Sequence, residues 1–151
     1  MNRFKTFEDD FQADLASTQY AALCYRQDEK GITRVLLITS RDTGRWVIPK
    51  GWPIAGKSAA SSAAQEAFEE AGVQGVADDH CIGVYSYGKV LGSKKIVPCV
   101  VAVYPLRVTG LKSSFPEKGQ RKLKWFKPEV AATKVVEPEL AVILAAFDPK
   151  A

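Results

Sequence analysis

Runs of apolar residues separated by polar turns dominate the first third of the chain. Residues 18–26 and 33–39 are apolar and rich in strand formers, and the polar segment between them, 27–31, ends in glycine. Two such runs joined by a short polar turn predict a β-hairpin. A turn over 41–44 then leads into a short strand over 45–48, which a proline ends.

The same pattern returns in the second half of the chain. Residues 81–90 and 96–104 predict two more strands, and the glycine-containing segment 91–95 between them predicts a second hairpin. Residues 110–121 contain two glycines and a proline, so we expect a loop there, and loops of this length often carry function. A final short strand is predicted over 123–126.

A helix is predicted over residues 58–71, between the two hairpins. Ser58 is a candidate N-cap and Gly72 a candidate C-terminal stop. One side of this helix is small and apolar, which would let it lie close to a sheet. That side is made of Ala60, Ala63, Ala64, Ala67, Phe68 and Ala71.

Two helices are predicted near the C-terminus, each beginning with a proline, which the first helical turn tolerates. The first runs from Pro128 to about Thr133, and the second begins at Pro138. The apolar residues of the second follow i, i+3, i+4, i+7 spacing and are predicted to face the core: Leu140, Ile143, Leu144 and Phe147.

Strands on both sides of a central helix, with a further helix at the end, predict an α/β (α+β) fold. We expect a helix–sheet–helix (α/β/α) sandwich with a mixed β-sheet. The chain has 151 residues and is 46% hydrophobic, which is enough for one domain with a sizeable core. We expect residues 1–17 to form a lead-in and residues 18–147 to form that single domain.

The charge balance narrows the class of partner. Lys+Arg minus Asp+Glu is 21 − 17 = +4, and the sequence pI is about 9.0. A mildly basic balance favours anionic partners. Nucleic acid is one class of anionic partner, but the basic residues are scattered and form no long basic run. Phosphorylated small molecules fit this charge balance equally well, and we do not expect a nucleic acid partner.

The three cysteines are odd in number and show no CxxC spacing. This argues against a disulfide framework and against a structural zinc site. Cys24 and Cys99 lie in apolar runs and are predicted to be buried. The longest apolar run, 96–104, contains a proline and is too short to cross a bilayer, so we expect no membrane association and a cytoplasmic location.

Three carboxylates lie near the end of the predicted helix over 58–71. Glu66, Glu69 and Glu70 fall within an arc of roughly 100° on one face. Oxygen-only clusters of this kind suit Mg2+ or Mn2+. Taken alone, they are also compatible with an ordinary solvated helix face, because glutamate is a strong helix former. The glycine- and proline-rich loop over 51–57, joined to this helix, favours the metal site.

Loop and helix together resemble the Nudix box, Gly-x5-Glu-x7-Arg-Glu-U-x-Glu-Glu-x-Gly-U, where U is aliphatic. Six positions match as they stand: Gly51, Glu66, Glu69, Glu70, Gly72 and Val73. Ala67 is a small stand-in for the first aliphatic residue, Lys57 replaces the first glutamate, and Gln65 replaces the arginine. The flanking segments 46–51 and 124–129 are also similar to the family, so the resemblance covers about 18–147.

The resemblance implies metal-dependent hydrolysis of a phosphoanhydride bond by water attack on phosphorus, with Mg2+ or Mn2+ as cofactor. Glu66 and Glu70 would be metal ligands, with Glu69 as a third ligand or the general base. A backbone carbonyl of Gly51 or Lys50 would complete the shell.

Two residues outside the box bear on proton transfer. Glu117 in the 110–121 loop is the best candidate for a base beyond the box, and it is equally compatible with a solvated position. His80, the only histidine, lies in a polar turn and is predicted at the surface.

Basic residues in loops near the box are similar to the pocket of the diphosphoinositol polyphosphate phosphohydrolase branch, which also hydrolyses dinucleoside polyphosphates. We expect the substrate-binding residues to include Ser40, Arg41, Lys50, Lys57, Lys95, Arg121 and Lys122, with Lys89 and Lys94 nearby. Trp52, Phe115 or Tyr87 would be able to stack on a base.

Lys57 and Gln65 are the departures from the family pattern, and we expect them to reduce activity or bias it toward highly anionic substrates. Two alternatives remain open. One is a catalytically silent phospho-ligand-binding Nudix domain, and the other is a hydrolase of other nucleoside diphosphate derivatives. A monomer or a homodimer is expected.

Overall fold

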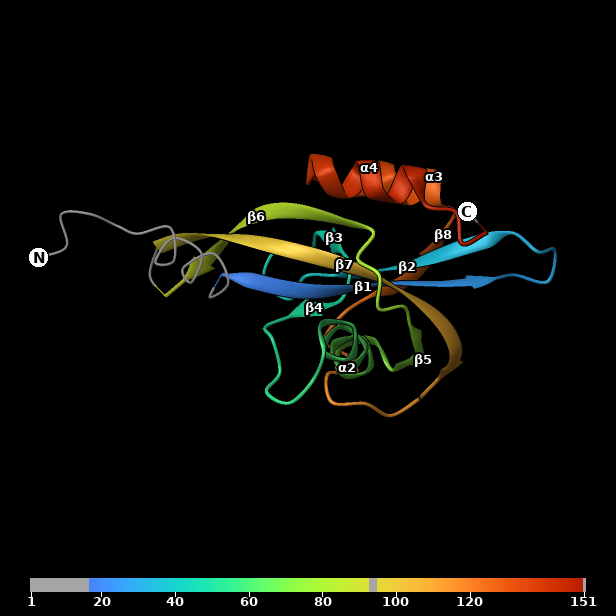
Figure 1. Ribbon diagram of the computed structural model, residues 1–151, viewed down its shortest axis with the longest axis horizontal. Helices are drawn as coiled ribbons and strands as arrows, with labels where there is room; N and C mark the ends of the chain where they lie inside the picture. The colour runs from blue at the N-terminus through green and yellow to red at the C-terminus, as the bar shows by residue number, and fades with distance from the viewer. Residues whose placement is uncertain (1–16, 93–94, 151) are drawn as a thin grey trace, which may run out of the picture.

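A computed structural model describes residues 17–92 and 95–150. Within them, eight strands form one sheet with the order β3-β2-β1-β7-β5, to which β4, β6 and β8 add as side pairings (Figure 1). The strands are β1 Thr18–Gln27, β2 Thr33–Thr39, β3 Trp46–Val47, β4 Lys50–Gly51, β5 Val73–Ala77, β6 Gly83–Leu91, β7 Lys95–Leu111 and β8 Leu123–Phe126. The predicted lead-in falls, up to residue 16, outside the described residues.

Both predicted hairpins are confirmed. β1 pairs with β2 in antiparallel fashion, Tyr25 opposite Val35, and β6 pairs with β7 in the same way, Tyr87 opposite Cys99. β1 also pairs with β7, but in parallel, from Thr18 opposite Val100 onward. This one parallel pairing makes the sheet mixed, as predicted.

The helices are α2 Ala59–Ala71, α3 Pro128–Lys134 and α4 Pro138–Ala146. Figure 1 shows α2 on one side of the sheet and α3 and α4 on the other. Successive residues of β1 point to opposite faces, so Ala22 and Cys24 pack with α2, whereas Ala21 and Leu23 pack with α3 and α4. The predicted α/β/α sandwich is therefore confirmed.

Helix α2 begins and ends where the sequence predicts. The Ser58 hydroxyl accepts a hydrogen bond from the Ser61 N–H at 3.1 Å, and Gly72 closes the helix in the left-handed region at φ 71°. Ala60, Ala63 and Ala67 are buried, and the last two pack in the core between the helix and the sheet. Small side chains on this side bring the helix, and the glutamates it carries, close to the sheet.

Other core predictions are also confirmed. Leu140 and Leu144 are fully buried, and Ile143 and Phe147 pack against the same cluster while partly exposed. Cys24 and Cys99 are buried free thiols. Among the helices that the structure describes, none is both long and apolar enough to span a membrane.

Three features differ from the sequence-based expectation. Strands β4 and β5 were not predicted, because β4 has two residues and β5 is rich in polar and small residues with glycine inside it. Strand β7 continues to Leu111, where β5 pairs with its second half. The predicted loop over 110–121 therefore begins after residue 111.

Candidate active site

A hollow of about 390 Å³ lies where β4, the C-terminal half of α2, the loop before β8 and strand β6 meet. Its charged lining is balanced, because four basic and four acidic side chains face it. The basic ones are Arg41, Lys50, Lys89 and Arg121, and the acidic ones are Asp42, Glu66, Glu70 and Glu117. Ser40, Gly51, Trp52, Tyr87 and Gln19 complete it. This hollow is the candidate active site.

Gly51 and Glu66 both line the hollow and are in direct contact with each other. A Cβ atom on Gly51 would overlap the Glu66 carboxylate, so a residue with any side chain would push that carboxylate away. Strand β4 places Gly51 opposite Tyr20 of β1, which fixes the backbone here. The first glycine of the box therefore makes room for the carboxylate that follows it by 15 residues.

Glu66 and Glu70 lie one helical turn apart on α2 and share this space. Burial raises the pKa of Glu66 to about 7, and the charges of Glu69 and Glu117 add to the rise. Burial also raises the pKa of Glu70 to about 7, against the opposing charge of Arg121. A bound cation would therefore stabilise the ionised forms of the two carboxyls, because it replaces the hydration that burial removes.

Glu117 joins them from the loop before β8. Its backbone N–H donates to the Glu69 carbonyl at 2.9 Å, which docks the loop on the last turn of α2. Arg121 donates from Nε and Nη2 to its Oε1 at 3.2 and 3.1 Å. Arg41 Nη1 lies 3.7 Å from the same oxygen and 3.1 Å from Gln120 Oε1.

Lys50 supplies a cation to the same hollow. Its Nζ lies 4.9 Å from the centre of the Tyr87 ring, and burial lowers the pKa of this lysine. Tyr87 in turn donates from its hydroxyl to Gln19 Oε1 at 2.6 Å. Gln19 and Asp42 also line the hollow and were not predicted as site residues. A glutamine within an apolar strand, as Gln19 is, is a sequence signal that would have pointed to a polar site, and it is buried here. Asp42 lies in a polar turn and offers no such signal.

Glu69 is turned away from the hollow. Its Oε2 accepts a hydrogen bond from Gln65 Nε2 at 2.6 Å, and it is absent from the residues that line the site. Gln65 thus hydrogen-bonds a glutamate of the box but contributes no charge. Lys57 lies near Gln65 in a separate hollow and does not reach the carboxylates of the candidate site.

Several of the predicted substrate-binding residues are not brought together. Lys95 is exposed at the start of β7, and Lys122 is exposed at the entrance to β8. Neither lines the candidate site, and Lys94 lies outside the described residues. Phe115 packs against Gly72, whereas Trp52 and Tyr87 do face the hollow.

Within residues 17–92 and 95–150, no three His, Cys, Asp or Glu side chains are placed so that together they would hold a metal ion. The donors that do converge are nevertheless of one kind. The carboxylate of Glu66 contacts Gly51, and Glu70 lines the same hollow; burial raises the pKa of both carboxyls. An all-oxygen donor set of this kind fits a hard divalent cation.

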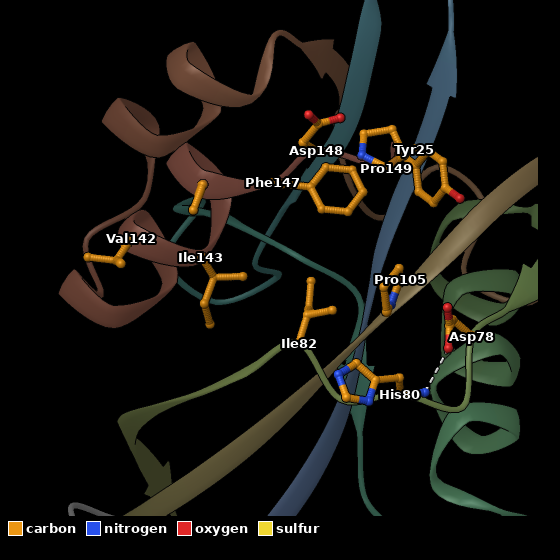
Figure 2. A pocket seen from close by; sticks show the side chains of 11 residues that line it. Tyr25, Asp78, His80, Ile82, Pro105, Val142, Ile143, Phe147, Asp148 and Pro149 are labelled. Atoms are coloured by element: carbon orange, nitrogen blue, oxygen red, sulfur yellow. Dashed lines mark hydrogen bonds between the residues drawn. The ribbon is translucent and has the colours of Figure 1, made fainter. Parts of the chain in front are cut away.

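A second hollow, of about 400 Å³, lies beside α4, away from the carboxylates. Figure 2 shows Phe147 and Tyr25 together at one side of it, with Ile82 and Ile143 nearby. His80 is exposed at its rim, as predicted, and its backbone N–H donates to Asp78. Most of its lining is apolar, and none of the described residues that line it is a lysine or arginine, the side chains that a phosphate would need.

Comparison with known proteins identifies the family to which the chain belongs. The sequence model of the NUDIX domain matches residues 17–147. The chain is 31% identical over 110 residues to Nudix hydrolase 16, mitochondrial, of Arabidopsis thaliana. This match covers 71% of the chain and 61% of the relative's length, so it spans less than two thirds of that protein.

Solved structures agree on the fold. C. elegans Ap4A hydrolase has a TM-score of 0.63 at 20% identity, over 85% of this chain and 93% of that one. E. coli dihydroneopterin triphosphate pyrophosphohydrolase has a TM-score of 0.64 at 17% identity, over 89% and 97%. The NUDIX domain of Shewanella oneidensis NrtR, complexed with ADP ribose, has a TM-score of 0.60 at 13% identity, over 85% and 84%.

The chain belongs to the Nudix family. The family resemblance seen in the box is thereby confirmed. None of these matches is specific to the diphosphoinositol polyphosphate branch. Nudix hydrolases generally use divalent metal ions.

Proposed function

We propose that this chain is a divalent-metal-dependent pyrophosphohydrolase that cleaves a phosphoanhydride bond in a small, highly anionic molecule. The observation that carries the proposal is the convergence of Glu66 and Glu70 at Gly51, inside a hollow that also holds four basic side chains. A diphosphate needs both features, since its negative charge must be neutralised before water can attack phosphorus.

Glu66 and Glu70 would hold the ion, with a backbone carbonyl of Gly51 or Lys50 beside them, and Mg2+ or Mn2+ fits these oxygens. When bound, the ion supplies charge neutralisation and a lowered pKa for water. Glu117 is the residue that we assign as general base, since it faces the hollow while Glu69 is held by Gln65. Glu69 would contribute to the negative field around Glu66.

Lys50, Arg41 and Lys89 are the cations that we assign to the substrate phosphates, because they line the same hollow as the carboxylates. Trp52 is 40% exposed at the rim and offers a face for an aromatic or sugar group. Lys57, Lys95 and Lys122 lie outside the hollow, and their predicted contact with substrate stays a prediction.

For the substrate we propose the diphosphoinositol polyphosphate or dinucleoside polyphosphate type. The basic lining supports a substrate with many phosphates, and one structural neighbour is named an Ap4A hydrolase. The experiment is phosphate release from a panel of both types, together with nucleoside diphosphate sugars and ADP-ribose, with Mg2+ and with EDTA. Cleavage of the sugars or ADP-ribose alone would contradict the substrate proposal, and no metal-dependent turnover on any member would contradict the enzyme proposal.

A second candidate function is a catalytically silent ligand-binding domain. The observation that favours it is the altered box, with Lys57 and Gln65 in place of a glutamate and an arginine. The same panel separates the two, because a silent domain would bind a member with measurable affinity and release no phosphate.

The remaining assignments are also proposals. We propose one Nudix domain over 18–147, a cytoplasmic location, and a monomer or homodimer. Light scattering on the purified chain tests the last of these, and a larger assembly would contradict it.

A further inference from the structure

Arg121 joins three elements at the candidate active site. It follows the loop over 112–120, and only 10% of its side chain is exposed. Its Nε and Nη2 donate to Glu117 Oε1, its Nη1 donates to the Thr39 carbonyl at 3.1 Å, and its Nη2 lies 3.7 Å from Glu70 Oε1. One guanidinium thereby links the end of β2, the loop and helix α2.

The backbone of the loop is anchored independently of Arg121. Lys112 N–H donates to the Gly72 carbonyl at 2.8 Å, and Glu117 N–H donates to the Glu69 carbonyl at 2.9 Å. These bonds fix where Glu117 sits but leave its side chain free to turn. The direction of that side chain is set by the two bonds from Arg121, which both end on Oε1.

We propose that Arg121 is a positioning residue that aims the Glu117 carboxylate at the Glu66–Glu70 pair, and that it does not bind substrate phosphate. The proposal deepens the proposed function and rests on it. Each of the three guanidinium nitrogens already faces a protein oxygen, so Arg121 is not placed as a free cation. A forked guanidinium suits this task better than an ammonium.

Gln65 leaves helix α2 without a positive charge beside its carboxylates. The box arginine is replaced by a neutral residue that bonds Glu69, so no positive charge on α2 itself steadies the carboxylates. Arg121 brings a positive charge from outside the helix to Glu70 and Glu117. Arg41 also pairs with Glu117, but its side chain is 59% exposed and the contact is longer, so it holds Glu117 less firmly.

A double-mutant cycle tests this inference. Arg121→Gln and Glu117→Gln are each expected to lower kcat by about 10- to 100-fold, since a misdirected catalytic group costs about that much, with KM changed less than about threefold. The double variant is expected to lose much less than the product of the two single losses, because Arg121 acts mainly through Glu117. Arg121→Lys is expected to recover only part of kcat, since it keeps the charge and loses the fork.

The matched control is Arg34→Gln. Arg34 makes a comparable ion pair with Asp28, 3.2 Å long, but at the turn between β1 and β2. We expect this variant to keep the wild-type kcat. A rise in KM for Arg121→Gln without a fall in kcat, or additive losses in the double variant, would overturn the positioning role.

The same cycle is run on Mn2+ binding, which needs no turnover and therefore separates this proposal from the proposed function. Glu117→Gln is expected to weaken Mn2+ about tenfold in the wild-type background and to have no effect when Arg121 is already glutamine. If the wild type binds Mn2+ without hydrolysing any substrate, the enzyme proposal fails and this cycle still decides the role of Arg121. Equal effects of Glu117→Gln in both backgrounds would overturn it.

Discussion

Gly51 shows at the scale of one residue how the box builds its site. The contact between its Cα and the Glu66 carboxylate leaves no room for a methyl group. The atoms that a new Cβ would meet belong to the flexible side chain of Glu66. A substitution would therefore displace the Glu66 carboxylate more than it would destabilise the fold. A glycine at this position is thus required by the site.

Gly51→Ala is accordingly expected to lower kcat by at least about tenfold, since a small displacement of the Glu66 carboxylate misplaces a proposed metal ligand. The unfolding midpoint is expected to change little. Steady-state kinetics and thermal unfolding measure the two effects. Gly110→Ala is the control, because a Cβ there meets only Gln74 at an ordinary 3.5 Å. Full activity in Gly51→Ala would contradict the account of this contact.

The raised pKa values of Glu66 and Glu70 predict a pH dependence of stability. Both carboxyls move from 4.5 to about 7 on folding, so the folded state favours their protonated forms. Their contribution is therefore full below about pH 4.5 and is lost as pH rises through 7.

Without metal, the unfolding midpoint of the wild type is expected to fall between pH 5 and pH 8 by more than that of Glu66→Gln, which cannot titrate there. Adding Mg2+ at pH 8 should recover the loss in the wild type, because binding to the folded state stabilises it. Glu139→Gln, an exposed change on α4, is the control. Parallel pH curves for wild type and Glu66→Gln would contradict the assignment of these pKa values.

At the scale of elements, helix α2 and the loop after β7 hold each other in place. Gly72 ends the helix at φ 71°, and a Cβ there would lie 2.5 Å from Phe115 Cδ1 and 2.7 Å from the Lys112 carbonyl. The loop that carries Glu117 therefore packs directly on the helix stop. A single glycine serves both the helix cap and the approach of the loop.

Gly72→Ala is expected to destabilise the fold by about 2–4 kcal/mol, of which the left-handed backbone accounts for about 1–2 kcal/mol. Gly31→Ala isolates that backbone part, since it has φ 78° with open space around it. Denaturant unfolding gives both values. A loss in Gly72→Ala no larger than in Gly31→Ala would show that the Phe115 contact is not tight.

The sequence allowed most of these elements to be predicted, and the exceptions have physical causes. Long apolar runs, the Ser58 cap and the Gly72 stop are local signals, so the hairpins and α2 were found. Strand β4 has two residues and depends on pairing with β1, and the parallel pairing of β1 with β7 joins residues about 80 apart. Non-local pairing of this kind leaves little trace in a short window.

The candidate site was predicted in large part, since Ser40, Arg41 and Arg121 from outside the box also line the hollow as expected. Glu66, Glu70, Gly51 and Lys50 meet because the loop and α2 are adjacent in sequence. Lys57 and Glu69 are equally close in sequence but turn elsewhere, and side-chain direction is decided by partners such as Gln65. Arg121 was predicted to bind substrate, but its bonds to Glu117 and Thr39 depend on tertiary contacts that no motif encodes.

At the scale of the whole molecule, the sheet separates two cores with different roles. α2 and its face of the sheet carry the carboxylates, whereas α3 and α4 cover the other face and contribute no residue to the lining of the candidate site. The C-terminal helices are therefore scaffold, and their loss should cost stability without altering the chemistry.

Leu144→Ala, which empties a fully buried position on α4, is expected to destabilise the protein by about 2–5 kcal/mol. At a temperature where the variant is still folded, its kcat and KM should match the wild type. Val142→Ala on the same helix, 67% exposed, should change neither property. A selective loss of kcat in folded Leu144→Ala would show that α4 takes part in the chemistry.

Glu70 and Glu66 are proposed to form a metal site for phosphoanhydride hydrolysis. The measurement that decides this is phosphate release by the wild type and by Glu70→Gln, each with Mg2+ and with EDTA. We expect turnover by the wild type only with Mg2+, and a loss of about 100-fold or more in Glu70→Gln, which keeps the shape of the side chain and removes its charge. Turnover in EDTA, or equal rates for the two proteins, would contradict the claim.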